Sequence, residues 1–305
     1  MSIVVDKVDK YYGTQKALNG ISFEVRSGEI VGFIGPNGAG KSSMMRIITG
    51  YLLADSGKVS VCGIDVSKSS LEAKRKIGYL PENNPLYLSM YVAEYLNYVA
   101  GLYQLKKNKD RVAEVIKMTG LLPESRKQIG QLSKGYRQRV GIAQALIHDP
   151  EVLILDEPTT GLDPNQIEEI RTLISDIGKK KTVMLSTHIM QEVEAICSKV
   201  IIVNNGEIIA NDFTANIHRV GAKQVIEIEF GNNVRQELLK LINGVESVVE
   251  LNERLFLIEA SEDSDVRSRL FEWAVTNNNS ILSMTRKEKK LQQLFSELTL
   301  KKNSK

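Results

Sequence analysis

The sequence predicts an α/β protein in two parts: a large domain with a parallel sheet and a phosphate-binding loop, then a smaller domain of short strands and helices. Three observations carry this prediction. An apolar run over residues 30–34 leads through a glycine-rich loop into a helical pattern at 44–48. A second apolar run, over residues 152–155, ends in two acids, as a strand buried in a parallel sheet does at a ligand site. Past about Arg219 the glycine-rich loops stop and the elements shorten.

Length and composition fit a globular protein. A chain of 305 residues suggests two domains, and 42% hydrophobic with 25% charged residues is ordinary. The net charge of +3 is too small to indicate nucleic-acid or anionic membrane binding. There is no secretion signal and no run of about 20 apolar residues. We therefore expect an intracellular protein that reaches a membrane only by docking, with Cys62 and Cys197 as free thiols.

The glycine-rich loop is the strongest chemical signal. Glycines let a loop curl so that its amides point at an anion, and the start of the next helix adds about half a positive charge. In this pattern the lysine reaches the β- and γ-phosphates, and the first serine binds Mg²⁺. The sequence predicts a nucleotide site formed by Gly35, Pro36, Asn37, Gly38, Ala39, Gly40, Lys41, Ser42 and Ser43.

Two strand-like segments precede this loop, at residues 3–5 and 21–25, with Tyr11, Tyr12 and a glycine turn between them. An aromatic ring ahead of a phosphate loop can stack on adenine, whereas tyrosines of an ordinary hairpin pack on the sheet. The residues alone leave both interpretations open.

Asp156 and Glu157 follow the second apolar run, where ligands gather in an open α/β sheet. Two adjacent carboxylates repel unless a cation lies nearby, which fits a magnesium nucleotide. A strand at 182–186 places His188 at the same edge, within reach of a γ-phosphate. The other histidines, His148 and His218, are expected to be exposed to solvent and inert.

A third stretch, Leu-Ser-Lys-Gly-Tyr at residues 132–136, leads into a helical pattern at 140–147. Ser133 is suited to cap that helix, and its hydroxyl with nearby amides can also meet an anion; both can hold. Asp163 stands in a turn before another helix, with Pro164 at its first position.

The remaining segments define the domains. A helical pattern from Tyr87 to about Gly120 predicts a helical subdomain at about 86–150, within a nucleotide-binding domain at 1–218. Residues 219–300 show the order β-α-β-β-α-β of a ferredoxin-like domain, with a last amphipathic helix at 287–300. Residues 301–305 form a basic tail.

In this order the motifs resemble those of the ATP-binding subunit of an ABC transporter, over about residues 1–215. The glycine-rich loop matches the Walker A loop and residues 132–136 match the signature motif. The other matches are Tyr12 to the adenine-stacking aromatic, Asp156 and Glu157 to the end of Walker B, Asp163 to the D-loop, and His188 to the switch histidine.

The resemblance implies two such domains closing head to tail, with ATP between one Walker A loop and the partner's signature motif. Ser133 and the amide of Gly135 would then act on the nucleotide of the other subunit, and Asp163 would lie near it. Glu157 would polarise the attacking water, Asp156 would hold Mg²⁺ through water, and His188 would contact the γ-phosphate.

The expected cofactors are ATP and Mg²⁺, and the expected partners are a membrane permease and a second copy of the chain, with no nucleic acid. The protein would be cytoplasmic and held at the inner face of the membrane by the permease.

Two positions depart from the family pattern. Glu82 stands where glutamine is usual, and its carboxylate could still act in catalysis or bind metal. Lys134 and Tyr136 stand where glycine and glutamine are commoner, and Lys134 adds positive charge near a phosphate.

Within the family the chain looks most like ABC-2-type exporters, and closest to the ATP-binding subunit of gliding-motility machinery, on residues 80–87, the signature motif and the C-terminal extension. One alternative is a soluble ABC-type ATPase acting on nucleic acid or ribosomes, disfavoured by the single phosphate loop and low charge. Another is ATP as a binding switch only, which Glu157 argues against. The C-terminal domain is expected either to have a regulatory role or contribute dimer contacts, or to be a packing module with no regulatory role.

Overall fold

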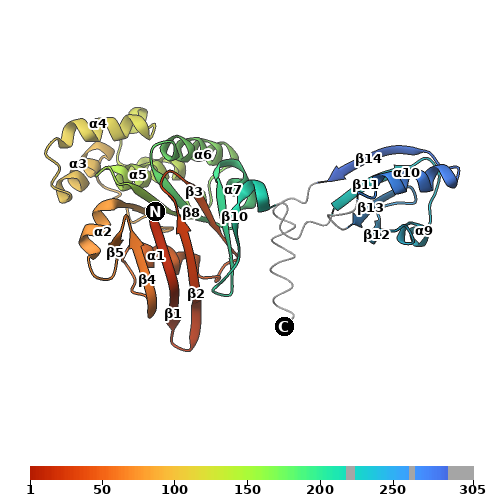
Figure 1. Ribbon diagram of the computed structural model, residues 1–305. Coiled ribbons are helices and arrows are strands. Elements are labelled where there is room, and N and C mark those ends of the chain that lie inside the picture. Colours follow the sequence, from red (N-terminus) through yellow and green to blue (C-terminus); the bar gives the residue numbers. More distant parts are fainter. Residues whose placement is uncertain (218–223, 261–264, 288–305) are drawn as a thin grey trace. The chain divides into compact units, whose positions relative to one another are not determined.

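The computed structural model describes residues 1–217, 224–260 and 265–287. The chain divides into two compact units, Met1–Thr214 and Ala215–Lys305 (Figure 1). His218, the tail at 301–305 and all but the first residue of the helix predicted at 287–300 lie outside the described residues.

The first unit is built on a six-stranded sheet of order β10-β9-β3-β8-β7-β6. Its strands are parallel except for β10, which runs antiparallel to β9. The central strands β7 and β8 are buried along their whole length, as the apolar runs predicted. The strands are β3 (Ile30–Ile34), β6 (Ile77–Leu80), β7 (Val152–Asp156), β8 (Thr182–Thr187), β9 (Lys199–Asn204) and β10 (Glu207–Phe213).

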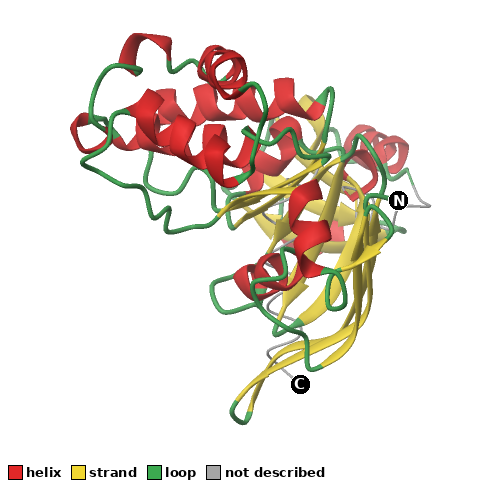
Figure 2. Ribbon diagram, turned by 90° about the vertical axis from the view of Figure 1, so that its left-hand side faces the viewer, coloured by secondary structure: helices red, strands yellow, loops and turns green. Residues whose placement is uncertain are grey.

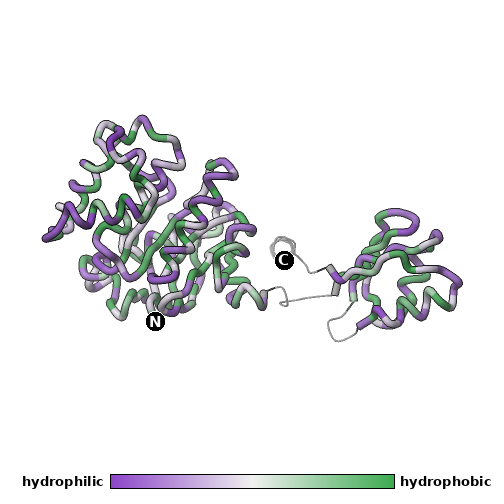
Figure 3. Tube along the Cα trace, turned by 90° about the horizontal axis from the view of Figure 1, so that it is seen from above, coloured by the Kyte–Doolittle hydropathy of each residue, from purple (hydrophilic) through white to green (hydrophobic). Residues whose placement is uncertain are grey.

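A second, antiparallel sheet of order β2-β1-β4-β5 packs against the first with helix α1. The shared core contains Phe23 and Phe33, whose ring centroids are 5.7 Å apart, and Met44 and Met45 of α1. Hydrophobic and hydrophilic stretches alternate along the chain in both units (Figure 3). The strands of this sheet are β1 (Ile3–Tyr12), β2 (Gln15–Val25), β4 (Ser56–Val61) and β5 (Ile64–Asp65).

The helices of the first unit include a cluster at one side, formed by α3, α4 and α5, of which α5 packs against β6 (Figures 1 and 2). The predicted cap is confirmed: Ser133 Oγ accepts from the amide of Tyr136 at 3.3 Å. Asp163, which stands in the turn predicted before the next helix, also caps its helix, because its Oδ1 accepts from the amide of Gln166 at 2.9 Å. The helices are α1 (Lys41–Ile48), α2 (Ser70–Lys76), α3 (Val92–Leu102), α4 (Asn108–Met118), α5 (Lys134–Leu146), α6 (Pro164–Gly178) and α7 (Met190–Ile196). Helix α8 (Thr214–Ile217) spans the boundary between the two units. None of the helices within the described ranges has the length and apolar character needed to cross a bilayer.

The second unit has a four-stranded sheet of order β12-β13-β11-β14 over its own core, which includes Phe230, Phe256 and Leu270. Every neighbouring pair is antiparallel. The elements follow the predicted order, β-α-β-β-α-β: β11 (Gln224–Phe230), α9 (Gln236–Lys240), β12 (Val245–Glu250), β13 (Leu255–Ala260), α10 (Arg267–Thr276) and β14 (Ile281–Lys287).

The prediction that His148 is a solvent-exposed, inert residue is wrong about its exposure. Its ring stacks on Tyr103 with centroids 4.0 Å apart, and its Nε2 lies 3.0 Å from the carbonyl oxygen of Ile77. Burial lowers the pKa of the ring to about 4. The side chain therefore ties the end of α3 to the start of β6, although the turn that follows it gave no sign of this.

Acidification is expected to destabilise the first unit through His148. Because the pKa falls from 6.5 to about 4 on folding, the neutral ring contributes stability that is present above pH 6.5 and lost as the pH falls through about 4. The loss is at most about 3 kcal/mol. Urea unfolding of the full chain at pH 7, 5.5 and 4 measures it.

The variant His148→Phe keeps the stacking partner but cannot gain a proton. Its free energy of unfolding should fall less steeply with acid than that of the wild type, and equal slopes would contradict the assignment.

Candidate functional site

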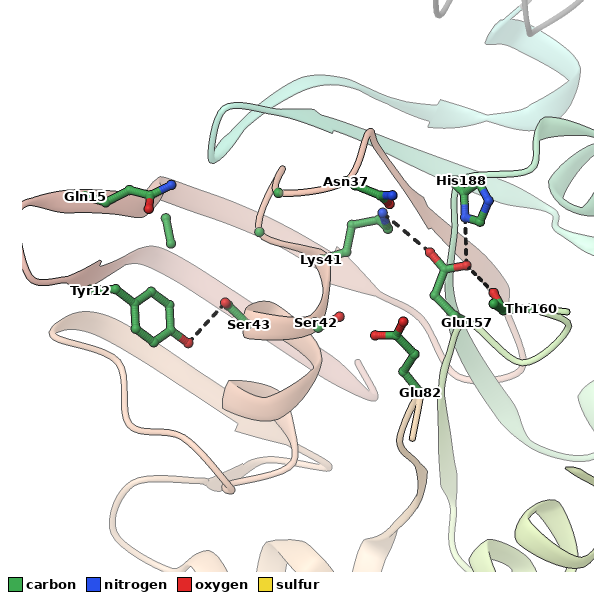
Figure 4. Close-up of a pocket in the computed structure, with 13 residues that line it drawn as sticks. Tyr12, Gln15, Asn37, Lys41, Ser42, Ser43, Glu82, Glu157, Thr160 and His188 are labelled. Atoms are coloured by element: carbon green, nitrogen blue, oxygen red, sulfur yellow. Dashed lines mark hydrogen bonds and ion pairs between the residues drawn. The ribbon is translucent and has the colours of Figure 1, made fainter. Parts of the chain in front are cut away.

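A cavity of about 460 Å³ opens where the parallel strands end (Figure 4). The loop after β3 and residues that follow β6, β7 and β8 all face it, together with the hairpin between β1 and β2. Its lining consists of Tyr12, Gln15, Ala17, Asn37, Gly38, Gly40, Lys41, Ser42, Ser43, Glu82, Glu157, Thr160 and His188.

Strand register sets this arrangement. In the β3–β8 pair, Ile34 lies opposite Thr187. In the β7–β8 pair, Asp156 lies opposite Ser186. The loop after Ile34, Glu157 and His188 therefore leave the sheet at one level, as expected for carboxyl ends of parallel strands.

The glycine-rich loop closes around the ammonium of Lys41. This side chain is only 6% exposed, and its Nζ donates to the carbonyl oxygens of Gly35 at 2.9 Å and Pro36 at 3.3 Å. Gly40 has a φ of 99°, and a Cβ there would lie 2.6 Å from the carbonyl oxygen of Ala17. The loop thus needs glycine at this position both for its backbone angle and for space.

Glu157 stands at the centre of the charged groups. Its φ of 50° turns the chain sharply away from β7, and its amide donates to Ser186 Oγ at 3.1 Å. The carboxylate is 7% exposed: Oε1 lies 3.5 Å from the ammonium of Lys41, and Oε2 accepts from Thr160 at 3.0 Å and lies 2.9 Å from Nδ1 of His188 (Figure 4). One carboxylate therefore joins the phosphate loop to the histidine.

Asp156 lies behind this group and is 1% exposed. Its Oδ1 accepts from Ser186 Oγ at 2.5 Å and from Ser42 Oγ at 3.2 Å. Burial raises the pKa of the carboxyl, and the two hydroxyl donors oppose that rise.

A hydroxyl beside a carboxylate is a hard oxygen donor set that suits Mg²⁺. Within the described ranges no three His, Cys, Asp or Glu side chains gather as metal ligands. Ser42 and Asp156 therefore fit an ion that is held jointly with phosphate oxygens, the usual mode for Mg²⁺.

Tyr12 and Gln15 border the cavity from the hairpin. The Tyr12 hydroxyl lies 3.2 Å from Ser43 Oγ, and the residue is 48% exposed, so a ring face is free for a ligand (Figure 4). Glu82 borders it from the chain that follows β6 and is exposed, with no hydrogen bond or ion pair to the described residues.

Ser133, Gly135 and Asp163 do not line this cavity. Ser133 and Asp163 are exposed at the starts of α5 and α6. These two helix starts interlock, because a Cβ on Gly135 would lie 2.8 Å from the side chain of Gln166.

Lys134 also takes part in this contact between the two helix starts, because its side chain lies against Gly161. A Cβ on Gly161 would lie 2.2 Å from the Lys134 ammonium. The ammonium therefore covers the turn that precedes Asp163.

Sequence reasoning missed Thr160, Ser186 and Gln15. Thr160 and Ser186 hold Glu157 and Asp156, but a serine or threonine near a strand end is common. Only the pairing of β7 with β8 shows that Ser186 lies beside the acids. Gln15 enters because the hairpin brings it beside Tyr12.

A family model described as ABC transporter matches residues 18–160, and one described as AAA domain, putative AbiEii toxin, Type IV TA system matches residues 128–194. The linearmycin resistance ATP-binding protein LnrL of Bacillus subtilis is 33% identical over 303 residues, covering 96% of this chain and 97% of LnrL. The chain belongs to the ABC transporter ATP-binding proteins. As a member of that family it is an ATP-hydrolysing nucleotide-binding cassette.

A second sequence relative and a solved structure are also similar to this chain. The bacitracin transport ATP-binding protein BcrA of Bacillus licheniformis is 38% identical over 213 residues, or 68% of this chain and 69% of BcrA. The dimeric post-hydrolysis structure of the ATP-binding cassette MJ0796 with ADP and Pi superposes with a TM-score of 0.64 at 26% identity, covering 69% of this chain and 98% of that one.

Replacing Asp156 by Asn is expected to stabilise the ABC unit in the absence of nucleotide. Its pKa is raised on folding, so the ionised carboxylate opposes folding at neutral pH, and this penalty disappears as the pH falls toward 3.8. The Asn oxygen can still accept from Ser42 and Ser186. Melting temperatures at pH 7 and pH 4 measure the effect.

The rise in melting temperature of Asp156→Asn over the wild type should be larger at pH 7 than at pH 4. An Asp156→Asn variant that melts below the wild type at pH 7 would show that the charge itself supports the fold.

Proposed function

We propose that this ABC protein powers a separate membrane permease for export, by binding and hydrolysing ATP between two copies of the chain. The observation that carries the proposal is the Glu157 carboxylate, which contacts both the phosphate-loop lysine and His188 in one cavity. The names of LnrL and BcrA, which refer to resistance and transport, support a role in export. Neither of these names refers to nucleic acid.

Each group in the cavity has a role that fits its surroundings. Lys41 and the loop amides bind the β- and γ-phosphates. Glu157 accepts a hydrogen bond from the attacking water, and His188 contacts the γ-phosphate. Ser42 and Asp156 hold Mg²⁺, which when bound neutralises charge on the phosphates. Tyr12 stacks on the adenine, and Glu82 reaches the metal or a water.

A second copy completes the site in this proposal. Ser133 and Asp163 are exposed at helix starts outside the cavity of their own chain, so they are available to a nucleotide held by another copy. Gly135 is buried, and it would offer only its amide, from the start of α5. The solved structure of MJ0796 is described as dimeric, which supports this mode. The interlock of residues 134–135 with 161–166 would let both groups move together.

The permease is proposed to contact an aromatic surface on the helical cluster. Tyr87, Tyr91 and Tyr98 are each about half exposed, and the rings of Tyr87 and Tyr98 lie 5.9 Å apart. Exposed tyrosines of this kind are enriched in protein interfaces. Tyr87 follows Glu82 by five residues, so a partner on this surface could sense the cavity.

Three narrower proposals concern location, the second unit and the cellular process. The protein is placed in the cytoplasm, at the inner face of the membrane, by its permease. The second unit is taken as a ferredoxin-like accessory domain that regulates or contributes dimer contacts, supported by its element order and separate core. A role in gliding motility rests on residues 80–87, the signature motif and the C-terminal extension.

Replacing Glu157 by Gln should leave ATP binding intact and lower the hydrolysis rate at least about 100-fold, the lower end of what a general base contributes. Binding persists because removing a negative charge beside Lys41 does not weaken its attraction for phosphate. Equilibrium ATP binding and steady-state phosphate release give the two numbers. Glu250→Gln, on an exposed strand of the second unit, is the matched control, and retained hydrolysis in Glu157→Gln would refute the assigned base.

The permease proposal predicts that the chain sediments with membranes from its own cells and, after detergent extraction, copurifies with a polytopic membrane protein. Tyr87→Ser with Tyr98→Ser should lower the membrane-bound fraction several-fold without changing ATP binding, because the interface loses two aromatic anchors. Phe271→Ser, an exposed aromatic position of α10, is the control. Recovery with ribosomes or DNA instead would favour the alternative function, that of a soluble ABC-type ATPase acting on nucleic acid or ribosomes.

A further inference from the structure

A buried carboxylate that none of the roles above uses lies against the turns that follow β7 and β8. Glu192, in the first turn of α7, is 1% exposed. It forms no ion pair with any of the lysine, arginine or histidine side chains that the structure describes. A buried carboxylate is unfavourable unless hydrogen bonds replace its water, so its donors must account for its presence here.

Those donors come from two different segments. Thr159 Oγ1 donates to one carboxylate oxygen, and Thr187 Oγ1 donates to the other at 2.7 Å. Both threonines are buried, at 2% and 0% exposure. Thr187 is held further, because its hydroxyl accepts from the amide of Ile189 at 3.0 Å.

Each threonine is close in the chain to a group of the proposed hydrolytic site. Thr159 lies two residues after Glu157, next to the Thr160 hydroxyl that donates to Glu157 Oε2 at 3.0 Å. Thr187 immediately precedes His188, whose Nδ1 lies 2.9 Å from the same oxygen. The carboxylate of Glu192 thus spans the two turns that carry Glu157 and His188.

We propose that Glu192 is a positioning residue for ATP hydrolysis, which fixes the turn after β7 against the turn after β8 and so sets the contact between Glu157 and His188. This rests on the roles proposed above for those two residues. A single rigid carboxylate with one donor on each oxygen suits this task, because neither turn can shift without breaking a hydrogen bond in a dry environment. An acid needed only to favour the start of α7 would act as well on the surface.

The variant Glu192→Gln tests the proposal with almost no change in volume. The amide offers a donor where the carboxylate offered an acceptor, so one threonine hydroxyl must turn and the spacing of the two turns is no longer fixed. We expect kcat for ATP hydrolysis to fall at least about tenfold, since small misplacements of catalytic groups have effects of this order. The Kd for ATP should stay within about twofold, because the phosphate loop is not in contact with Glu192. Glu194→Gln, the same substitution at an exposed position of the same helix, should hydrolyse at the wild-type rate.

A spectroscopic measurement separates positioning from mere support of the fold. The chain has three histidines, so ¹⁵N-histidine labelling with a His188→Gln reference identifies the ring signals of His188. In Glu192→Gln these signals should move while those of His148 stay in place. A purely structural role would lower the melting temperature and leave both kcat and the His188 signals unchanged, which would overturn the inference.

Thr159→Val is the second variant and is measured in the same way if Glu192→Gln does not fold, since it removes one of the two donors. Failure of the inference is distinct from failure of the proposed function. If Glu157→Gln still hydrolysed ATP, the proposed role of Glu157 as the base for the attacking water would be wrong. Wild-type hydrolysis by Glu192→Gln, with Glu157→Gln inactive, would remove only the role of Glu192.

Discussion

The position of β8 between β3 and β7 is the constraint on which the site depends. Backbone hydrogen bonds fix Ile34 opposite Thr187 and Asp156 opposite Ser186, so the phosphate loop, the acids and the histidine leave the sheet at one level. In a parallel pair a shift of one residue would also turn each side chain to the other face. The buried apolar side chains of these strands, which lie in the core, hold the register and therefore also the chemistry.

Hydroxyl groups supply the side-chain hydrogen bonds that replace water at the two most deeply buried acids beside the site. Two carboxylates, Asp156 and Glu192, are almost completely buried and have no ion pair with the described residues. Their donors are Ser42, Ser186, Thr159 and Thr187. A hydroxyl can satisfy an anion without neutralising it, so these two carboxylates keep their negative charge beside Glu157, whose own carboxylate lies 3.5 Å from the ammonium of Lys41. Such a centre favours a ligand that brings its own cation.

Much of the fold and of the site could be predicted from the sequence. Apolar runs located β3, which leads into the glycine-rich loop, β7, which ends in two acids, and β8, which ends before His188. The phosphate loop and Glu157 followed from residue chemistry at fixed spacing. What failed depends on pairing between distant segments. Nothing near His148 shows that Tyr103 covers its ring, and nothing near Glu192 shows that Thr159 and Thr187 approach it, because these contacts come from the order of strands and not from local pattern.

The interlock between the two exposed helix starts has a consequence for sequence variation. The ammonium of Lys134 lies where a side chain at residue 161 would be, so the two positions share one volume. With a φ of 71°, residue 161 can accept asparagine as the least unfavourable replacement for glycine, and the Lys134 ammonium, the far end of a flexible side chain, would then have to move aside. A side chain at residue 161 would thus displace the Lys134 ammonium from the turn before Asp163, so the residue chosen at one position changes the surroundings of the other.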